Sequence, residues 1–322
     1  MPQICEKPVH PESKLRVVFF GTPEFASRFL EGLLNDPYFE VVGVVTQPDE
    51  MLGRKKELTA PPVKMLALKH CVSVFQPTRM KDEEFHGAVR ALKADVFVIV
   101  AYGRILPEAL LNIPPYGSVN VHPSLLPKWR GPSPKQAAIA AGDEETGISI
   151  MKIDAEMDHG PILAQKKISL DQNETIESLT KKVVELGVPL LCDTLKGYHQ
   201  GSIMPIDQDH AAATYCKLLS REDGVITFQE SAVEIERKVR AYNPWPGTSI
   251  VITRNGLPLQ IKVFSVSLSG RKLSPGEIIM DNGHFLVGTS TNAIEIIELQ
   301  PANGKRMKAA DFIRGYKDIT LS

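Results

Sequence analysis

The stretch RVVFFG at residues 16–21 decides the fold of the first part of this chain. Four apolar residues follow Arg16 without interruption, and Gly21 ends the run. Strands of a parallel sheet are covered on both faces, so they show continuous apolar runs rather than an alternation. Pro23 suits the first turn of a helix. The stretch therefore predicts a buried parallel strand followed by a helix that reaches about Leu34.

Apolar runs and amphipathic segments alternate along the chain to about residue 200. Further strands are expected at 41–45, 95–100, 117–122 and 146–153, and a hairpin partner of the last at 161–170. Helices are expected near 62–68, 80–92, 135–142 and 175–198. This alternation predicts an α/β fold with a doubly wound, mostly parallel sheet and an antiparallel addition near its end.

Beyond Gly201 the sequence shows no strong periodicity of apolar residues. An amphipathic helix is expected at 231–242, and short β-rich runs follow between 249 and 299. Closely spaced short strands predict a small, OB-like β-barrel. We therefore expect four parts: a disordered lead-in at 1–14, a catalytic domain at 15–200, a linker at 201–217 and a C-terminal β-barrel domain at 218–322.

The composition is that of an ordinary globular protein, with 43% hydrophobic and 23% charged residues and a net charge of −1. No run of about 18 apolar residues occurs, so no membrane span is expected. The amino terminus lacks the apolar core of a secretory signal. The four cysteines form no C-x-x-C pair, which argues against a structural metal site and a disulfide framework. We expect a cytoplasmic protein, monomeric and without a metal.

The strand GSVNVH at 117–122 carries the first candidate site. Asn120 and His122 are two residues apart, so their side chains leave the strand on the same face. The strand ends at His122, and open α/β sheets bind ligands at the carboxyl ends of their strands. A hydrogen-bond donor beside an imidazole suits a reaction in which negative charge develops on an oxygen.

Two loops follow that could complete the site. The first, SLLPKWRGPSP at 124–134, is irregular and apolar, either shaping a pocket or covering the sheet as a rigid connector. The second, IDAEMDHGPIL at 153–163, brings three carboxylates, Asp154, Glu156 and Asp158. Any of the three could be a turn cap, which is the commoner role of an aspartate in a loop.

The motifs FFGTPEFA, VVTQPD, NVHPSLLPKWRGPSP and DAEMDHGPIL occur here in the order in which they occur in folate-dependent formyltransferases, and the chain resembles that family. The resemblance implies a catalytic set of Asn120, His122 and Asp158 and a formyl donor, 10-formyltetrahydrofolate. It also implies folate contacts from Ser124, Leu125, Leu126 and Pro127. Tyr102, Gly103 and Ile105 follow the strand 95–100 and are expected to form the opposite wall of the pterin pocket.

Residues 213–247 resemble the start of the C-terminal domain in the methionyl-tRNA branch of this family. That resemblance implies initiator methionyl-tRNA as the acceptor, and cations are expected to contact its phosphates. The candidates are Arg54, Lys55 and Lys56 in the loop 50–62 and Lys305, Arg306 and Lys308 near the end. The loop is shorter and less basic than in the family, and His159 stands where the family has Thr.

Three alternatives remain open. A sugar-nucleotide formyltransferase, of the UDP-amino-arabinose type, can carry a related C-terminal part. A nicotinamide oxidoreductase could use the same sheet, but GTPEFA is not G-x-G-x-x-G, and Gln47 stands where an acidic residue would bind ribose. A non-catalytic RNA-binding protein would explain the barrel and the basic tail. It would leave Asn120 and His122 unexplained, and the net charge of −1 argues against strong general affinity.

Overall fold

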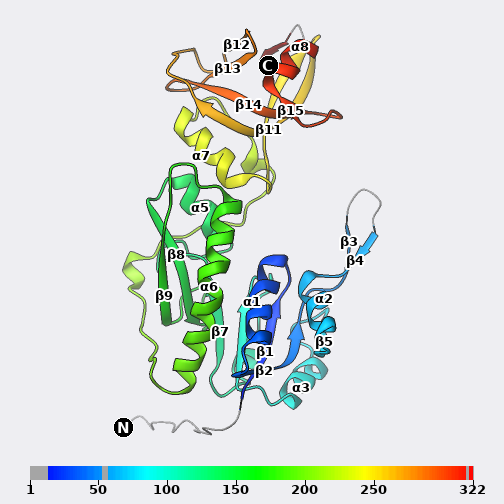
Figure 1. The fold of residues 1–322 in the computed structure, drawn as a ribbon, viewed down its shortest axis with the longest axis vertical. Coiled ribbons are helices and arrows are strands. Elements are labelled where there is room, and N and C mark those ends of the chain that lie inside the picture. The colour runs from blue at the N-terminus through cyan, green and yellow to red at the C-terminus, as the bar shows by residue number, and fades with distance from the viewer. Residues whose placement is uncertain (1–13, 53–56, 317–318, 322) are drawn as a thin grey trace. The chain divides into compact units, whose positions relative to one another are not determined.

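A computed structural model describes residues 14–52, 57–316 and 319–321, and the chain forms two compact units (Figure 1). The described parts of Met1–Gly131, Thr146–Ile168 and Thr180–Tyr215 form the first unit. Those of Pro132–Glu145, Ser169–Leu179 and Cys216–Ser322 form the second. The expected lead-in lies outside the described residues, apart from Lys14. The domain boundaries at 15–200 and 218–322 stay a prediction, because the second compact unit also includes the segments Pro132–Glu145 and Ser169–Leu179.

A seven-stranded sheet forms the centre of the first unit. Its order is β5 (Val74–Phe75), β2 (Phe39–Val45), β1 (Leu15–Gly21), β6 (Val96–Val100), β7 (Ser118–His122), β8 (Glu145–Lys152) and β9 (Ile162–Ser169). The pairings from β5 to β7 are parallel, and β8 is antiparallel to β7. This confirms the doubly wound, mostly parallel sheet with an antiparallel addition.

The helices that connect these strands begin and end close to the predicted positions. They are α1 (Glu24–Asn35), α2 (Pro62–Lys69), α3 (Glu83–Ala91), α5 (Pro134–Ala141) and α6 (Ile176–His199), whereas the short α4 (Glu108–Leu111) was not predicted. Helices α1 and α6 pack closely in the foreground of Figure 1. A Cβ at Gly32 would lie 2.3 Å from Cγ1 of Val188, and one at Gly187 would lie 2.9 Å from Cζ of Phe29. The two glycines therefore permit this approach, although glycine weakens a helix interior.

The apolar run that begins β1 is buried on both of its faces. Val18 and Phe20 pack with Phe97 and Ile99 of β6 in one core cluster, while Phe19 is buried as well. This two-sided burial explains why the strand shows no alternation of polar and apolar residues. The strand is thereby held rigidly, and its carboxyl end is fixed in place.

An antiparallel sheet forms the centre of the second unit. Its order is β12 (Ile278–Asp281), β13 (His284–Gly288), β14 (Ala293–Pro301), β11 (Leu257–Leu268), β10 (Thr248–Arg254) and β16 (Ile319–Leu321), with β15 (Met307–Lys308) beside β14. Its core includes Ile235 and Val239 of α7 (Ala232–Tyr242) and Phe312 of α8 (Ala309–Gly315). The sheet forms a half-barrel and confirms the small antiparallel C-terminal fold.

Several short elements had no counterpart in the expectations. They include α4, β5, the hairpin of β3 (Glu50–Leu52) and β4 (Glu57–Thr59), and two 3-10 turns, η1 (His210–Ala212) and η2 (Glu222–Gly224). Among the described residues, no helix combines the length and apolar character needed to cross a membrane. Cys71 and Cys192 are free thiols.

Candidate active site

The carboxyl ends of three neighbouring strands are tied together at one point. Thr22, after β1, and Gln47, after β2, both donate hydrogen bonds to the carbonyl oxygen of Tyr102, which follows β6, each at 3.1 Å. Gly103 has a φ of +82°, which glycine adopts without strain. The loop after β6 is therefore fixed at the edge where doubly wound sheets bind their ligands.

Asn120 lies on β7, paired with Ile99 of β6 on one side and with Met151 of β8 on the other. Its side chain is partly exposed and lines a pocket of about 420 Å³. Asp158 lines the same pocket, and Ile153 contributes to its apolar wall. An asparagine amide has two hydrogens to donate, so Asn120 can hydrogen-bond a ligand from the floor of the sheet.

His122 ends β7 and is 4% exposed. Its Nε2 lies 2.9 Å from the carbonyl oxygen of Trp129, and its Nδ1 lies 3.5 Å from Oδ1 of Asp158. A carbonyl oxygen only accepts, so Nε2 carries a hydrogen and Nδ1 is the atom that can exchange one. Burial lowers the pKa of His122 below its ordinary value, while Asp158 and the Trp129 carbonyl oppose this fall.

The carboxylate of Asp158 has a second fixed contact. Its Oδ2 accepts a hydrogen bond from the backbone nitrogen of Gly131 at 2.7 Å. The backbone of Asp158 has a φ of +51°, in the left-handed region that aspartate visits as single residues. The carboxylate therefore bridges the loop after β7 and the imidazole of His122.

The other two carboxylates of this loop are not directed at His122. Oδ2 of Asp154 lies 2.7 Å from Nδ1 of His159, and its Oδ1 accepts from the backbone nitrogen of Glu156 at 3.0 Å. Glu156 is itself exposed. The structure thus brings Asp158, rather than its two neighbours, to the imidazole. From the sequence this choice depended on the family resemblance, and the catalytic roles stay a prediction.

Arg130 and Gln208 also belong to the site, although the sequence gave no reason to select either of them. Oε1 of Gln208 accepts from Nε and Nη2 of Arg130 at 3.2 and 2.8 Å. Its Nε2 donates to the carbonyl oxygens of Asp158 and Gly160 at 2.9 and 2.7 Å. Gln208 falls in the segment expected as a linker. No local signal marks it, because its partners lie 48 to 78 residues away in the chain.

Of the three residues in the loop after β6 that were predicted to contact folate, one lines the pocket. Ile105 lines the pocket with 93% of its surface exposed. Tyr102 instead is buried in the core, with its ring centroid 5.6 Å from that of Phe20 and its hydroxyl donating to Sδ of Met80 at 3.2 Å. Its carbonyl, described above, is the part of Tyr102 that holds the loop.

The loop 124–127 is anchored by its own hydrogen bonds. Ser124 is buried, and its Oγ donates to the carbonyl oxygen of Lys128 at 2.6 Å. The backbone nitrogen and oxygen of Leu126 bond to Oγ of Ser149 at 3.1 Å and Nε2 of Gln165 at 2.9 Å. Among the described residues, those lining the 420 Å³ pocket come from the neighbourhood of β6, β7 and β8 and the 153–158 loop, and do not include 124–127.

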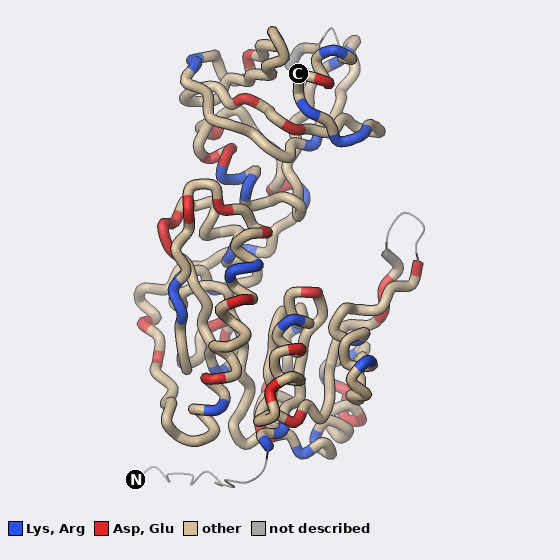
Figure 2. The backbone as a smooth tube through the Cα atoms, in the orientation of Figure 1, with Lys and Arg blue, Asp and Glu red and all other residues tan. Residues whose placement is uncertain are grey.

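The residues expected to contact tRNA fall into two groups. Arg54, Lys55 and Lys56 lie outside the described residues. Lys305 and Lys308 are exposed in the second unit. In Figure 2 the acidic and basic positions are interspersed along the backbone of both units.

Arg306, between these two lysines, is already paired. Its Nη2 lies 2.5 Å from Oε2 of Glu298, and its guanidinium lies 4.3 Å from the ring centroid of Phe264. Hydrogen bonding to Arg306 lowers the pKa of the Glu298 carboxyl. Arg306 is thus directly ion-paired with Glu298, whereas Lys308 lies opposite Glu298 across the β14–β15 pair and acts on its carboxyl only through charge.

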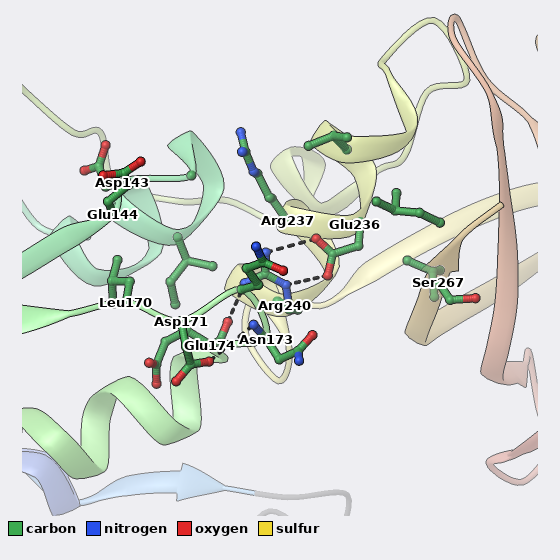
Figure 3. A pocket seen from close by; sticks show the side chains of 16 residues that line it. Asp143, Glu144, Leu170, Asp171, Asn173, Glu174, Glu236, Arg237, Arg240 and Ser267 are labelled. Atoms are coloured by element: carbon green, nitrogen blue, oxygen red, sulfur yellow. Dashed lines mark hydrogen bonds and ion pairs between the residues drawn. The ribbon is translucent and has the colours of Figure 1, made fainter. Parts of the chain in front are cut away.

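A larger pocket, of about 570 Å³, lies within the second unit (Figure 3). Arg240 is paired there with Glu236 at 2.5 and 2.9 Å and donates to the carbonyl oxygen of Glu174 at 2.5 Å. Arg237 donates to the carbonyl oxygen of Ala141 at 3.2 Å. None of the expected catalytic residues lines this pocket. Its arginines bond other parts of the same unit, so size alone does not identify the active site.

Two family models match the chain over almost its whole length. The model described as formyl transferase matches residues 15–195. The model described as formyl transferase, C-terminal domain, matches residues 218–317.

Relatives at more than 40% identity cover nearly all of the chain. The methionyl-tRNA formyltransferase of Roseiflexus sp. (strain RS-1) is 45% identical over 305 residues, which are 94% of this chain and 93% of the relative. The protein of the same name from Caldicellulosiruptor saccharolyticus is 41% identical over 303 residues, 94% of this chain and 97% of the relative.

Solved structures with a similar fold have low sequence identity. WlaRD, a sugar 3N-formyl transferase, gives a TM-score of 0.65 at 17% identity, covering 91% of this chain and 100% of that one. HypX from Aquifex aeolicus, in complex with tetrahydrofolic acid, gives 0.61 at 18% identity, covering 94% of this chain and 47% of that one. At these identities the likeness concerns the fold.

Proposed function

The chain belongs to the formyl transferase family, and on that premise we propose that it transfers the formyl group of 10-formyltetrahydrofolate to the amino group of methionyl initiator tRNA. The observation that carries the proposal is a pocket lined by Asn120 and Asp158, with the buried imidazole of His122 lying 3.5 Å from the Asp158 carboxylate. Relatives named methionyl-tRNA formyltransferase, which include the C-terminal part, support this choice of acceptor.

The reaction we propose is an acyl transfer. The methionyl amine attacks the formyl carbon, the carbonyl oxygen becomes an oxyanion, and the tetrahedral intermediate collapses when the bond to the folate nitrogen breaks. The amide of Asn120 donates a hydrogen bond to this oxyanion from its place on β7. A donor fixed before the reaction stabilises developing charge without reorganisation, which is why such donors have large effects on rate.

The pair of His122 and Asp158 supplies the proton chemistry. With Nε2 bound to the Trp129 carbonyl, the proton that can move lies between Nδ1 of His122 and the Asp158 carboxylate. Burial favours the neutral imidazole and the nearby carboxylate favours the charged one; burial is the larger effect, so the pKa of His122 lies below its ordinary value. We propose that Asp158 accepts the proton lost by the amine and returns it to the folate nitrogen as its bond to the formyl carbon breaks. His122, whose ring nitrogens face the Trp129 carbonyl and Asp158, orients that carboxylate.

The donor site we propose is the 420 Å³ pocket beside Asn120. Ile105, Leu106 and Met151 give it apolar walls that suit the flat ring system of a pterin. The loop 124–127, held by Ser149 and Gln165, is proposed to contact the remainder of the folate. Lys305 and Lys308 are proposed to contact tRNA phosphates.

We also propose a cytoplasmic location and a monomeric state. The free thiols of Cys71 and Cys192 suit a reducing compartment.

An acceptor competition tests the proposal. The full chain is incubated with 10-formyltetrahydrofolate and either methionyl initiator tRNA or a UDP-amino-sugar, and formylated product and released tetrahydrofolate are measured. We expect the tRNA to be formylated and uncharged tRNA to be inert. The sugar is the second candidate acceptor, because the fold is similar to that of a sugar formyl transferase over 91% of this chain. Formylation of the sugar alone would contradict the acceptor, and no transfer to either would contradict the function.

A further inference from the structure

The turn that presents Asp158 to His122 needs support from outside its own sequence. Asp158 has a φ of +51°, a conformation that persists where surrounding contacts hold it. The bond from Gly131 to Oδ2 holds the carboxylate but not the backbone of the turn. A different residue must therefore fix the peptide groups around Asp158.

Gln208 provides that support from the segment between the two family-matched regions. Its Nε2 donates to the carbonyl oxygens of Asp158 and Gly160 at 2.9 and 2.7 Å, on either side of His159. Its Oε1 accepts two hydrogen bonds from Arg130. These four bonds use the full capacity of a glutamine amide, and Gln208 is only 6% exposed. A buried amide satisfied in this way has one orientation.

Arg130 determines which way the Gln208 amide faces. A guanidinium only donates, so the Gln208 oxygen must face it and the amino group must face the turn. Arg130 is 2% exposed, and its backbone nitrogen donates to the carbonyl oxygen of Thr214 at 2.8 Å. Its chain neighbours Trp129 and Gly131 bond His122 and Asp158 respectively.

We propose that Gln208, oriented by Arg130, is a positioning residue for formyl transfer, holding the Asp158 turn so that its carboxylate faces His122. This inference rests on the proposed function, which it deepens. Gln208 does not touch the reacting atoms and acts through Asp158. The segment 201–217 is thus a part of the catalytic machinery and not a passive connection.

The sharpest variant is Gln208→Glu. The glutamate keeps an oxygen for Arg130, so the buried guanidinium stays paired. Its second oxygen replaces the amino group and faces the carbonyl oxygens of Asp158 and Gly160, which it cannot hydrogen-bond. We expect kcat to fall at least about tenfold while KM for both substrates stays within about twofold, because a small misplacement near the chemistry has a large effect on rate.

Titration of the His122 imidazole by NMR gives a readout that general destabilisation would not move. Asp158 raises the pKa of His122 against the effect of burial, so we expect this pKa to fall in Gln208→Met, which removes the bonds to the turn without adding a charge, as the carboxylate turns away. Gln200→Glu makes the same change of charge as Gln208→Glu at an exposed glutamine and is the matched control. It should leave kcat and the titration as in the wild type.

Each outcome decides between the possibilities. A fall in kcat with an unchanged His122 titration, or a shifted titration with wild-type kcat, overturns the positioning role, as does an unchanged variant. If the wild-type chain transfers no formyl group, the proposed function fails. The NMR arm then still reports whether Gln208 positions Asp158 against His122.

Discussion

Asn120 faces the pocket from the centre of the sheet, with β7 paired on both sides of it. Its replacement by alanine removes a donor but no backbone pairing. We expect Asn120→Ala to lower kcat about a hundred- to a thousandfold, the range for the loss of one oxyanion donor. Steady-state kinetics and thermal unfolding of the same preparation separate this loss from unfolding. Asn173→Ala, at an exposed asparagine of the second unit, is the control. Near-normal turnover in Asn120→Ala would remove the oxyanion role.

The buried imidazole of His122 should make the stability of the fold depend on pH. Burial lowers its pKa below the ordinary 6.5, so the unfolded state binds this proton more readily than the folded state. The contribution of His122 is therefore complete above about pH 6.5 and is lost as the pH falls toward the lowered pKa. We expect His122→Gln to flatten the fall of Tm between about pH 6.5 and 5.

Calorimetry of both proteins across this interval measures the effect. The same substitution at the exposed His70 controls for the loss of an imidazole. Parallel curves of Tm against pH for the wild type and His122→Gln would show that His122 binds its proton equally in both states. The prediction that burial lowers the pKa of His122 in the folded state would then be wrong.

The elements most readily predicted from the sequence are those whose burial is uniform along their length. β1 and β6 are apolar runs, and α6 shows a sustained helical period, so their ends differ from prediction by a residue or so. β5 and the hairpin strands β3 and β4 have two or three residues each, too few for any period to appear. Their conformation follows from pairing with a neighbour and not from their own composition.

The candidate site divides in the same way. The shared face of Asn120 and His122 follows from the two-residue period of a strand, which is a local property. Asp158 could be chosen from its loop only by resemblance. Gln208 could not be chosen at all, since its partners are brought together by the fold over 48 or more residues. Side-chain contacts between distant segments have no signature in a single sequence.

Gly160 allows the turn that carries Asp158 to lie directly on the end of β8. A Cβ at this position would lie 2.1 Å from the carbonyl oxygen of Lys152, a backbone atom that cannot move aside cheaply. We expect Gly160→Ala to lower kcat at least about tenfold by displacing the turn. The free energy of unfolding should fall by about 1–3 kcal/mol, as for other overpacked sites.

Gly87→Ala is the matched control for this change. Gly87 lies within α3, and a Cβ there meets no atom within 4 Å. Alanine is the better helix former, so this variant should be neutral or more stable by up to about 1 kcal/mol, with wild-type kcat. Denaturant unfolding and kinetics are measured for both variants. Equal behaviour of the two would mean that the turn tolerates displacement from β8.

The whole molecule divides its proposed work between its two units. We propose that the chemistry takes place at the parallel sheet of the first unit, where Asn120 and Asp158 line one pocket and His122 lies beside Asp158. Recognition of a long polyanionic acceptor needs cations spread over a larger surface, and phosphate contacts position such a ligand without reading its sequence. The net charge of the chain is −1, so binding of a polyanionic acceptor depends on the positions of individual exposed cations and not on the total charge.

The second unit offers a direct test of this division. Arg306 is paired with Glu298, whereas Lys305 and Lys308 are exposed on either side of it. We expect Lys305→Ala and Lys308→Ala each to raise KM for methionyl-tRNA and to reduce the slope of log KM against log salt by about 1, with KM for the folate donor and kcat unchanged. Arg306→Ala should change the slope less, because its charge is already compensated. Kinetics at several salt concentrations measure all three variants.

A change in the salt slope of Arg306→Ala equal to that of the lysine variants would show that the ion pair between Arg306 and Glu298 opens on binding. An unchanged slope in every variant would place phosphate recognition elsewhere in the chain.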